Sequence, residues 1–551
     1  MTRNLLVIMV LAFWLGANAQ TYTPVTDARL LNPEPGNWLM WRGNYQSWGY
    51  SPLSKINVQN VNRLVPVWAF STGVGQGHEA PPIVNGNYMF ITAPYNKLFA
   101  LDARNGRLIW KYERQLPDDV VTCCDVVNRG VAVYGDKVYM GTLDAHLIAF
   151  DARTGKIVWD VTVADYKTRH TITSPPVAVK GKIITGIHGG EFGIRGFLAA
   201  YDANTGKELW RTYTVGNNGT WPGESWKTGG GATWLTGSYD PSTNTLFWGT
   251  SNPSPWMDGA RDPKQHDLKW TSSVIAVDPD TGRIKSGFQY SPNDAWDYDG
   301  VNEKILIDVG GRPSLISAHR NSWLYRLDRS GGNLRYAQAY KYAVSNVYQR
   351  INAEGRPVWN PEHRPDIGKT VNACPSFLGG KNWNPGAYSP QTRLLYFATN
   401  DWCMDIRGAQ VEYAAGEAFV GAEFEMNTVP GANHVGVLRA IDPSNGKIAW
   451  EYKFRAPLWG GVLTTAGGLV FTGSLDDRGF HAFDARTGKR VWSFTTNSGV
   501  IGVPMSYEVG GTQYIAVYSG FGGAIPLWAG PVAKLTKDVP MGGVLWVFAL
   551  K

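Results

Sequence analysis

The feature that most constrains the fold is a short motif that recurs along the chain. In each copy an aspartate is followed after three residues by glycine, and after three more by tryptophan. Five copies are complete and two lack the tryptophan: Asp102/Gly106/Trp110, Asp151/Gly155/Trp159, Asp202/Gly206/Trp210, Asp442/Gly446/Trp450 and Asp484/Gly488/Trp492, then Asp278/Gly282 and Asp328/Gly332. Alternating apolar stretches flank each copy, so the motif predicts a turn between two strands. The aspartate caps this turn, and the glycine takes the positive φ that other residues avoid.

The spacing of the motif predicts a β-propeller. Most neighbouring copies lie about 40–50 residues apart, which is the usual length of one blade. We expect each tryptophan to dock against the next repeat, burying about 150–250 Å² while its ring N–H finds a backbone acceptor. The gap between Asp328 and Asp442 has room for one further unit without the motif, around residues 388–392. This unit would make eight blades.

Two further expectations concern the ring. The strand at residues 543–550 is expected to share a blade with residues 65–70, and such closure leaves no open sheet edge. The long gap between Asp202 and Asp278 contains an insertion of roughly 25 residues, which predicts a functional loop.

Composition supports one all-β body at residues 20–551 rather than several domains. The chain has 64 Gly and 32 Pro, 13% aromatic residues and only 18% charged residues, which suits short strands joined by tight turns. Its formal charge of +7 is spread without basic clusters, so we expect no nucleic-acid partner.

The N-terminus predicts export. Arg3 precedes an apolar run at residues 5–15, and Ala17-Asn18-Ala19 forms a cleavage site of small residues. This is the pattern of a secretory signal peptide at residues 1–19. The run is shorter than the ~20 residues that span a membrane. We therefore expect a soluble protein of the periplasm without a membrane anchor.

The cysteines of the chain indicate which covalent cross-links and cofactors it can have. Four cysteines in an exported protein predict two disulfides. Of the three possible pairings, we choose Cys123 with Cys124 and Cys374 with Cys403. No Cys-x-x-Cys-His motif for a covalently bound haem is present.

Asp297 and Asp299 would point to one side if their segment were extended, and could then share a metal ion. The alternative is a solvated turn, and the propeller could equally be a non-catalytic scaffold of the cell envelope.

The chain resembles the quinoprotein alcohol dehydrogenases, which carry pyrroloquinoline quinone (PQQ) in an eight-bladed propeller. The resemblance runs from Trp41-Arg42-Gly43 to the C-terminus, and its most specific motif is Cys123-Cys124 with Arg129 five residues later. The segment at 520–530 looks closest to the ethanol-type members. The resemblance implies oxidation of primary alcohols, ethanol and longer. Methanol as the main substrate is the alternative within this family.

The resemblance also implies a cofactor site. A disulfide between Cys123 and Cys124 would lie against one face of the quinone, and Trp234 would stack on the other. Arg129 would pair with a PQQ carboxylate, which its planar guanidinium suits. Its other implied contacts are Glu79, Thr173, His188, Gly189, Gly190, Arg320, Asn382 and Trp459. His188 departs from the family, whose members usually have a small hydroxyl residue there.

Four residues match the metal ligands of the family: Glu191, Asn252, Asp297 and Asp299. They offer only oxygen, which suits a hard cation. Asp299 is typical of the lanthanide-using members. Three carboxylates suit a trivalent ion, so we expect a lanthanide(III), with calcium as the alternative.

The resemblance implies roles for two of these residues and a redox partner. Asp297 would act as the general base towards the alcohol. Arg320 would lie near the quinone oxygens and stabilise negative charge there. Because the chain has no haem motif, a separate soluble cytochrome c is the expected electron acceptor. Relatives are often homodimers, so a homodimer is a further expectation.

Overall fold

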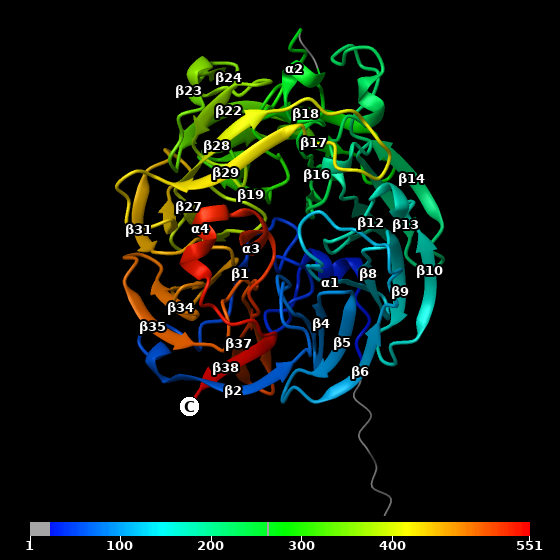
Figure 1. Ribbon diagram of the computed structural model, residues 1–551. Coiled ribbons are helices and arrows are strands. Elements are labelled where there is room, and N and C mark those ends of the chain that lie inside the picture. Colours follow the sequence, from blue (N-terminus) through cyan, green and yellow to red (C-terminus); the bar gives the residue numbers. More distant parts are fainter. Residues whose placement is uncertain (1–21, 262–263) are drawn as a thin grey trace, which may run out of the picture.

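The computed structural model describes residues 22–261 and 264–551, so the predicted signal peptide at 1–19 lies outside the described residues. In the described part, eight sheets of four or five strands stand around a central axis (Figure 1). This arrangement confirms the predicted propeller and is consistent with eight blades.

Four blades come from the first half of the chain. In chain order their strands are β3 (Ile83–Asn85), β4 (Tyr88–Ala93), β5 (Lys97–Asp102) and β6 (Leu108–Glu113); β7 (Ala132–Tyr134), β8 (Lys137–Gly141), β9 (His146–Asp151) and β10 (Ile157–Thr162); β11 (Val177–Val179), β12 (Lys182–Gly186), β13 (Phe197–Asp202) and β14 (Glu208–Tyr213); β15 (Ser238–Asp240), β16 (Thr245–Gly249), β17 (Ser273–Val277) and β18 (Ile284–Gln289).

The other four complete the ring. They are β19 (Ile305–Val309), β20 (Arg312–Ala318), β21 (Trp323–Asp328) and β22 (Arg335–Lys341); β26 (Ala387–Ser389), β27 (Leu394–Asn400), β30 (Gly436–Ile441) and β31 (Ile448–Phe454); β1 (Tyr50–Ser51), β32 (Val462–Thr465), β33 (Leu469–Gly473), β34 (Gly479–Asp484) and β35 (Arg490–Thr495); β36 (Met505–Val509), β37 (Thr512–Ser519), β38 (Val544–Leu550) and β2 (Leu64–Ser71). Two small sheets lie outside these blades: β23 (Tyr348–Ile351) with β24 (Pro357–Trp359), and β25 (Thr370–Ala373) with β28 (Trp402–Gly408) and β29 (Ala422–Thr428).

The repeated motif joins neighbouring blades, as predicted. It lies between the third and fourth strands of a blade, where Gly155 has a φ of +70°. A Cβ atom on Gly155 would lie 2.6 Å from the ring of Trp110 in the preceding blade, and Trp110 Nε1 donates to Ala152 O at 3.0 Å. The other four motif tryptophans donate likewise: Trp159 to Ala203, Trp210 to Pro279, Trp450 to Ala485 and Trp492 to Leu64. The glycine therefore provides both the turn and the seat for the tryptophan.

The ring closes where the sequence predicts. β2 pairs antiparallel with β38, with Val65 opposite Ala549, so an early strand and the last strand of the described chain share one blade. In this blade Trp68 takes the place of the motif tryptophan, because its ring lies against Gly106 of the next blade.

The predicted position of the eighth unit is wrong. Residues 387–389 form β26, which is the first strand of the blade that carries Asp442, and not an additional blade. The two small sheets fill the long gap before Asp442 instead. The eighth blade is the closure blade, which lacks the motif because its outer strand β2 comes from the N-terminal side of the chain.

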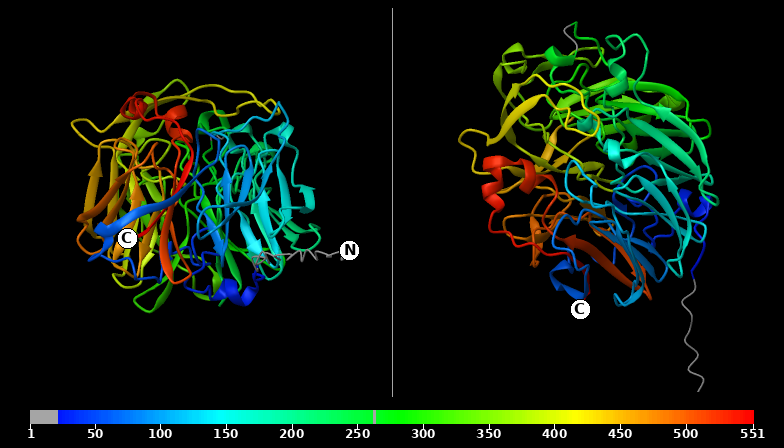
Figure 2. Two further views of the ribbon diagram at one scale, coloured as in Figure 1. Left: turned by 90° about the horizontal axis from the view of Figure 1, so that it is seen from below. Right: turned by 45° about the vertical axis from the view of Figure 1, so that its right-hand side comes forward.

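One end of the ring carries most of the connecting structure. The short helices α3 (Ala524–Trp528) and α4 (Gly530–Ala533) gather there with the loop between β28 and β29, and α1 (Asp27–Leu31) lies at the opposite end (Figure 2). The predicted functional insertion forms the loops around β15 and β16, and these loops hold Trp234 and Asn252.

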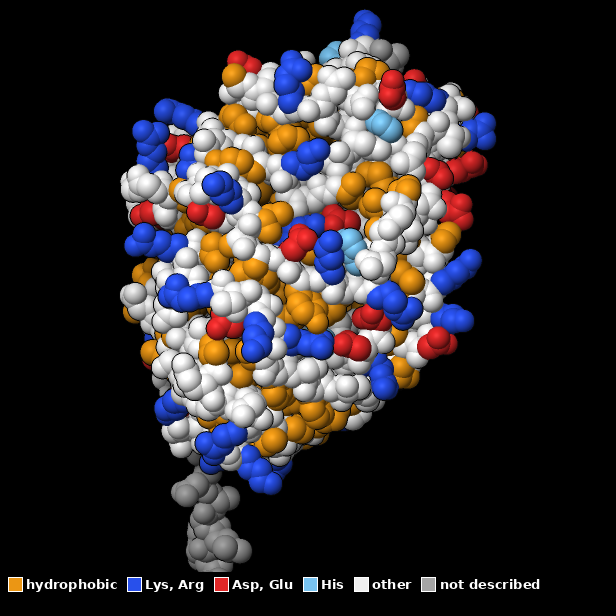
Figure 3. Space-filling model, turned by 90° about the vertical axis from the view of Figure 1, so that its left-hand side faces the viewer, with side chains coloured by type: hydrophobic (Ala, Val, Ile, Leu, Met, Phe, Trp, Pro, Cys, Tyr) orange, Lys and Arg blue, Asp and Glu red, His pale blue; other side chains and the backbone are white. Residues whose placement is uncertain are grey.

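The distribution of surface charge and the length of the helices are two further features of the described residues. On the side seen in Figure 3, Lys and Arg side chains are spread among Asp and Glu, without a continuous basic patch. Within residues 22–261 and 264–551, no helix combines the length and apolar character that crossing a membrane requires.

Candidate active site

A cavity of about 290 Å³ is lined in part by Ala524 and Trp528 of α3. Its volume is near the lower end of the ~300–1,000 Å³ typical of small-molecule sites. Its wall includes most of the residues that the sequence predicted: Glu79, Cys123, Cys124, Arg129, Thr173, His188, Glu191, Trp234, Asp297, Asp299, Arg320, Asn382 and Trp459. Predicted residues from many separate blades thus meet in one place.

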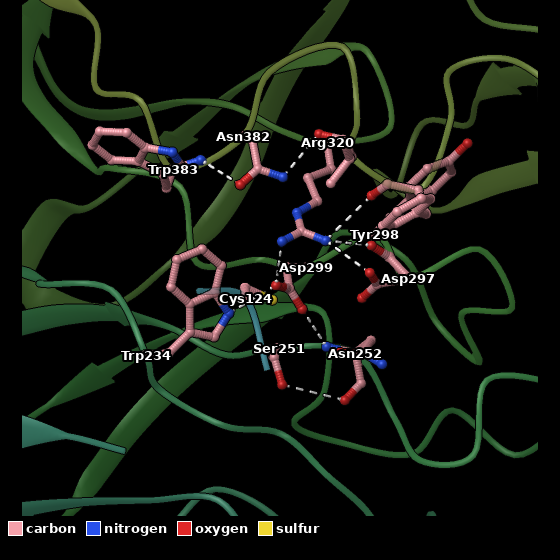
Figure 4. Close-up of polar contacts among 12 residues, drawn as sticks. Cys124, Trp234, Ser251, Asn252, Asp297, Tyr298, Asp299, Arg320, Asn382 and Trp383 are labelled. Atoms are coloured by element: carbon pink, nitrogen blue, oxygen red, sulfur yellow. Dashed lines mark hydrogen bonds and ion pairs between the residues drawn. The ribbon is translucent and has the colours of Figure 1, made fainter. Parts of the chain in front are cut away.

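Arg320 joins the two predicted aspartates (Figure 4). Its Nη1 lies 3.0 Å from Asp297 Oδ2, and its Nη2 lies 2.8 Å from Asp299 Oδ2. Asp299 also accepts hydrogen bonds from Trp234 Nε1 at 2.8 Å and from the backbone N of Asn252 at 2.7 Å. Both oxygens of Asp299 are therefore bonded to protein groups, whereas Oδ1 of Asp297 has no hydrogen-bond partner among the described residues.

The backbone at Asp297 is not extended, although the prediction that Asp297 and Asp299 point to one side assumed an extended segment. Asp297 has a φ of +64°, in the left-handed region that residues other than glycine rarely adopt. The turn is held by Asp294, whose Oδ2 accepts from the N–H of Tyr298 at 2.8 Å. The two carboxylates converge because of this turn and not because of strand alternation. Such strained positions are concentrated at functional sites.

Three of the four predicted metal ligands have a buried oxygen that is free to bind a hard cation. Glu191 Oε2, Asn252 Oδ1 and Asp297 Oδ1 are buried acceptors without a hydrogen-bond partner in the described part of the chain. Buried polar atoms rarely lack a partner. Burial raises the pKa of the Asp297, Asp299 and Glu191 carboxyls, so a nearby cation would stabilise their charged forms. The set contains only oxygen donors, as hard cations require.

A second charged group lies on the cavity wall around Arg129. Its Nε lies 2.8 Å from Glu79 Oε2, and its Nη1 donates to Thr173 Oγ1 at 2.9 Å. The guanidinium carbon is 5.1 Å from the ring centroid of Trp234 and 5.2 Å from that of Trp383. Burial raises the pKa of Glu79 to about 7, although Arg129 opposes this effect. A buried arginine between two indoles suits an anionic, planar ligand.

One of the two expected disulfides is formed. Cys374 and Cys403 are bonded, which confirms that pair. Cys123 and Cys124 are free thiols in the structure, so the expected bond between them is not formed, although their Sγ atoms lie only 2.6 Å apart. Both face the cavity.

His188 and the two glycines after it lie around the same wall. Burial, followed by the charges of Arg129 and Arg320, lowers the pKa of His188 to about 3, so its ring is neutral near pH 7. The ring meets Trp234 edge-on, with centroids 5.6 Å apart. Gly189 and Gly190 do not line the cavity. A Cβ atom on Gly190 would lie 3.7 Å from Asn252 Oδ1, so Gly190 packs beside a predicted ligand.

The family description "PQQ: Glucose/ethanol/alcohol dehydrogenase, beta-propeller domain" matches residues 38–336 and 432–515. The chain belongs to the PQQ-dependent alcohol dehydrogenase family. This assignment agrees with the predicted enzyme class and excludes the scaffold alternative.

Relatives of this alcohol dehydrogenase match over nearly its whole length. The quinoprotein alcohol dehydrogenase PedH of Pseudomonas putida is 44% identical, over 99% of this chain and 96% of the relative. The lanthanide-dependent methanol dehydrogenase of Methylacidiphilum fumariolicum is 40% identical, over 95% and 94%. Among solved structures, a europium-containing methanol dehydrogenase matches with a TM-score of 0.91 and 40% identity, covering 94% of this chain and 99% of that one.

The sequence did not predict the apolar part of the dehydrogenase's cavity. Phe377 and Phe424 have ring centroids 4.4 Å apart, and Trp256 and Trp528 lie 5.6 and 6.1 Å from Phe424. All four line the cavity, and Phe377 O accepts from Arg320 Nη1 at 3.2 Å. They come from four separate segments without a shared motif. Trp383 was also missed, although its position next to Asn382 was a usable signal.

Proposed function

We propose that this dehydrogenase oxidises primary alcohols, ethanol and longer, to aldehydes with PQQ and a lanthanide(III) ion in the cavity. The observation that carries the proposal is the acidic cluster, in which Asp299 adds a third carboxylate to buried Asp297 and half-buried Glu191. Arg320 offsets one of these three negative charges, but the carboxylates of PQQ would add more, so a trivalent cation would balance the site better than calcium. The similarity to lanthanide-dependent and europium-containing methanol dehydrogenases supports this choice.

The residues divide into two sets. Glu191, Asn252, Asp297 and Asp299 would hold the cation. PQQ would be held by the predicted contacts on the cavity wall, of which Arg129, Trp234 and Asn382 are the best placed to bind a charged ring system. When bound, PQQ supplies a two-electron oxidant, and the cation supplies Lewis acidity.

Asp297 would take the hydroxyl proton of the alcohol. Its Oδ1 has no hydrogen-bond partner in the described residues and is the atom that would receive the proton, whereas Oδ2 is held by Arg320 at 3.0 Å. Burial raises the pKa of Asp297 and the charge of Arg320 lowers it, so Arg320 favours the ionised form that a base needs. Arg320 is also placed to stabilise negative charge that develops in the cavity.

The aromatic wall would bind the alkyl part of the alcohol. Trp256, Phe377, Phe424 and Trp528 give one side of the cavity an apolar lining close to Arg320. Burying each additional methylene there contributes about 0.8 kcal/mol. This lining favours ethanol and longer alcohols over methanol.

Electrons would leave the reduced site to a soluble cytochrome c, since the sequence has no haem-attachment motif of its own. We place the protein in the periplasm on the strength of the signal peptide expected at residues 1–19. Residues 20–551 would form a single catalytic propeller.

The test is a turnover screen. Protein freed of metal and PQQ is reloaded with PQQ plus either lanthanum or calcium, and kcat/KM is measured for methanol, ethanol and 1-butanol. We expect lanthanum to give at least about tenfold higher turnover than calcium, with methanol the poorest substrate. Equal or higher activity with calcium overturns the lanthanide assignment. The highest kcat/KM for methanol overturns the substrate assignment, and no turnover with either metal overturns the proposal as a whole.

A further inference from the structure

Three consecutive buried residues lie behind the acidic cluster and contact several parts of the site. Asn302, Glu303 and Lys304 are at most 1% exposed, and none of them lines the cavity. We call residues 302–304 the buried hub. Charged side chains this deeply buried are rare unless they are paired, so the hub needs an explanation that the proposed reaction does not give.

Hydrogen bonds connect the hub to the backbone beside two site residues. Lys304 Nζ donates to Gly300 O at 2.7 Å, directly after Asp299. Asn302 Nδ2 donates to Ala318 O at 2.6 Å, two residues before Arg320. The hub is thus bonded to the segments that carry an acidic residue of the cluster and the arginine that pairs with it.

An ion pair connects the hub to the cofactor side. Lys381 Nζ lies 2.5 Å from Glu303 Oε2, and both side chains are fully buried. Lys381 Nζ also donates to Asn382 O at 3.1 Å, and Glu303 Oε1 accepts from Gly386 N at 2.8 Å. Figure 4 shows Asn382 beside Arg320, with Asp297 and Asp299 beyond it. The pair therefore bridges the segment of the predicted metal ligands and the segment of a predicted PQQ contact.

We infer that Lys381 and Glu303 form a positioning pair that fixes Asn382 relative to Asp297 and Asp299. An apolar pair of similar volume could fill the same space at similar stability, because desolvation offsets most of the attraction between buried charges. An apolar pair could not bond to Asn382 O and Gly386 N at the same time. The ion pair therefore contributes these two hydrogen bonds. Such hydrogen bonds from outside a site hold the groups that touch a ligand in place. This inference rests on the proposed PQQ and metal site.

The test measures binding instead of activity. Lys381→Met removes the charge while keeping an unbranched chain, and Glu303→Gln keeps the shape of its partner. PQQ affinity is followed by quenching of tryptophan fluorescence, and metal affinity by sensitised terbium(III) luminescence. We expect either change to raise the Kd for PQQ by about 10–100-fold. In the double variant, Lys381→Met with Glu303→Gln, we expect a smaller loss than the sum of the two, because neither partner is left charged and unpaired.

A matched control separates positioning from stability. Arg439 and Asp401 form another buried pair, 2.5 Å apart, and neither lines the cavity. Arg439→Met should lower the Tm about as much as Lys381→Met does, but it should leave the Kd for PQQ unchanged. The inference is overturned if Lys381→Met and Glu303→Gln bind PQQ like the wild type, or if Arg439→Met loses as much affinity. If Lys381→Met does not fold, Glu303→Gln alone decides. Failure of the wild type to bind PQQ and terbium overturns the proposed function itself.

Discussion

Asp297 and Asp299 bond to different nitrogens of one guanidinium, yet their environments differ. Asp299 is bonded at both oxygens, to Arg320, Trp234 and the backbone of Asn252. Asp297 has one oxygen held by Arg320 and one without a protein partner. In the proposed mechanism, this difference would make Asp297 the base that takes the proton, while Asp299 would add to the charge of the cluster.

Replacing Asp297 with asparagine tests that division. The amide keeps the size of the side chain but cannot take up the proton, so we expect kcat to fall by about 10²–10⁴-fold. Bound PQQ, measured by its absorbance, should remain. Asp258→Asn is the control, because Asp258 also pairs with an arginine, Arg364 at 2.8 Å, away from the cavity. Near-normal kcat in the Asp297 variant would remove this residue from the role of base.

Glu79 gives a pH dependence with a definite sign. Its pKa rises from 4.5 to about 7 on folding, so the folded protein binds more protons than the unfolded chain between these values. The stability that Glu79 contributes is present below pH 4.5 and is lost as the pH rises to about 7. The Tm of PQQ-free wild type should therefore fall relative to that of Glu79→Gln across this range. A constant difference in Tm between the two proteins would show that Glu79 does not titrate there.

At the scale of elements, five of the blade joints consist of a glycine turn and a tryptophan that rests on it. Gly155 combines a φ of +70° with a Trp110 ring 2.6 Å from where its Cβ would be. Gly135 has a φ of +60° but no atom within 4 Å of that position. Comparing substitutions at the two positions therefore distinguishes the effect of backbone strain from the effect of contact with the tryptophan.

Substituting alanine at each of these two glycines measures how much the contact with the tryptophan contributes to stability. Both substitutions carry the cost of a left-handed residue, about 1–2 kcal/mol. Gly155→Ala must also displace an aromatic ring, which costs about 1–3 kcal/mol more. Denaturant unfolding should thus show a larger loss of stability for Gly155→Ala than for Gly135→Ala. Equal losses would mean that the tryptophan does not depend on the glycine.

The sequence predicted these joints because every part of a joint lies within one motif or the next. The site was less predictable, since its geometry depends on contacts between distant segments. The left-handed backbone of Asp297 cannot be deduced from an Asp-x-Asp pattern, and the aromatic wall has no pattern at all. The resemblance supplied the residues proposed to bind PQQ and the cation, but not the buried pair of Lys381 and Glu303, which does not line the cavity.

For the whole molecule, the ring is closed by β2 and β38. Their pairing extends from Leu64 opposite Leu550 to Ser71 opposite Val544. Seven blades carry a copy of the motif, and the eighth unit was misplaced because the closure blade combines β2 with the last three strands and needs no copy.

Deleting residues 544–551 tests closure. The change exposes the edges of β2 and β37, and unpaired edges promote association between chains. We expect aggregation in size-exclusion chromatography and loss of a single cooperative unfolding transition. Deleting Lys551 alone is the control. A monomeric truncated protein with unchanged unfolding would show that the ring does not need this strand.

The central claim is that the oxygen-rich cluster holds a highly charged cation beside PQQ. A crystal structure of the protein loaded with PQQ and lanthanum tests it most directly. The account predicts one strong anomalous peak within coordinating distance of Glu191, Asn252, Asp297 and Asp299, next to a planar ligand at Trp234. A cavity without that peak, or with these side chains turned away from one another, would contradict it.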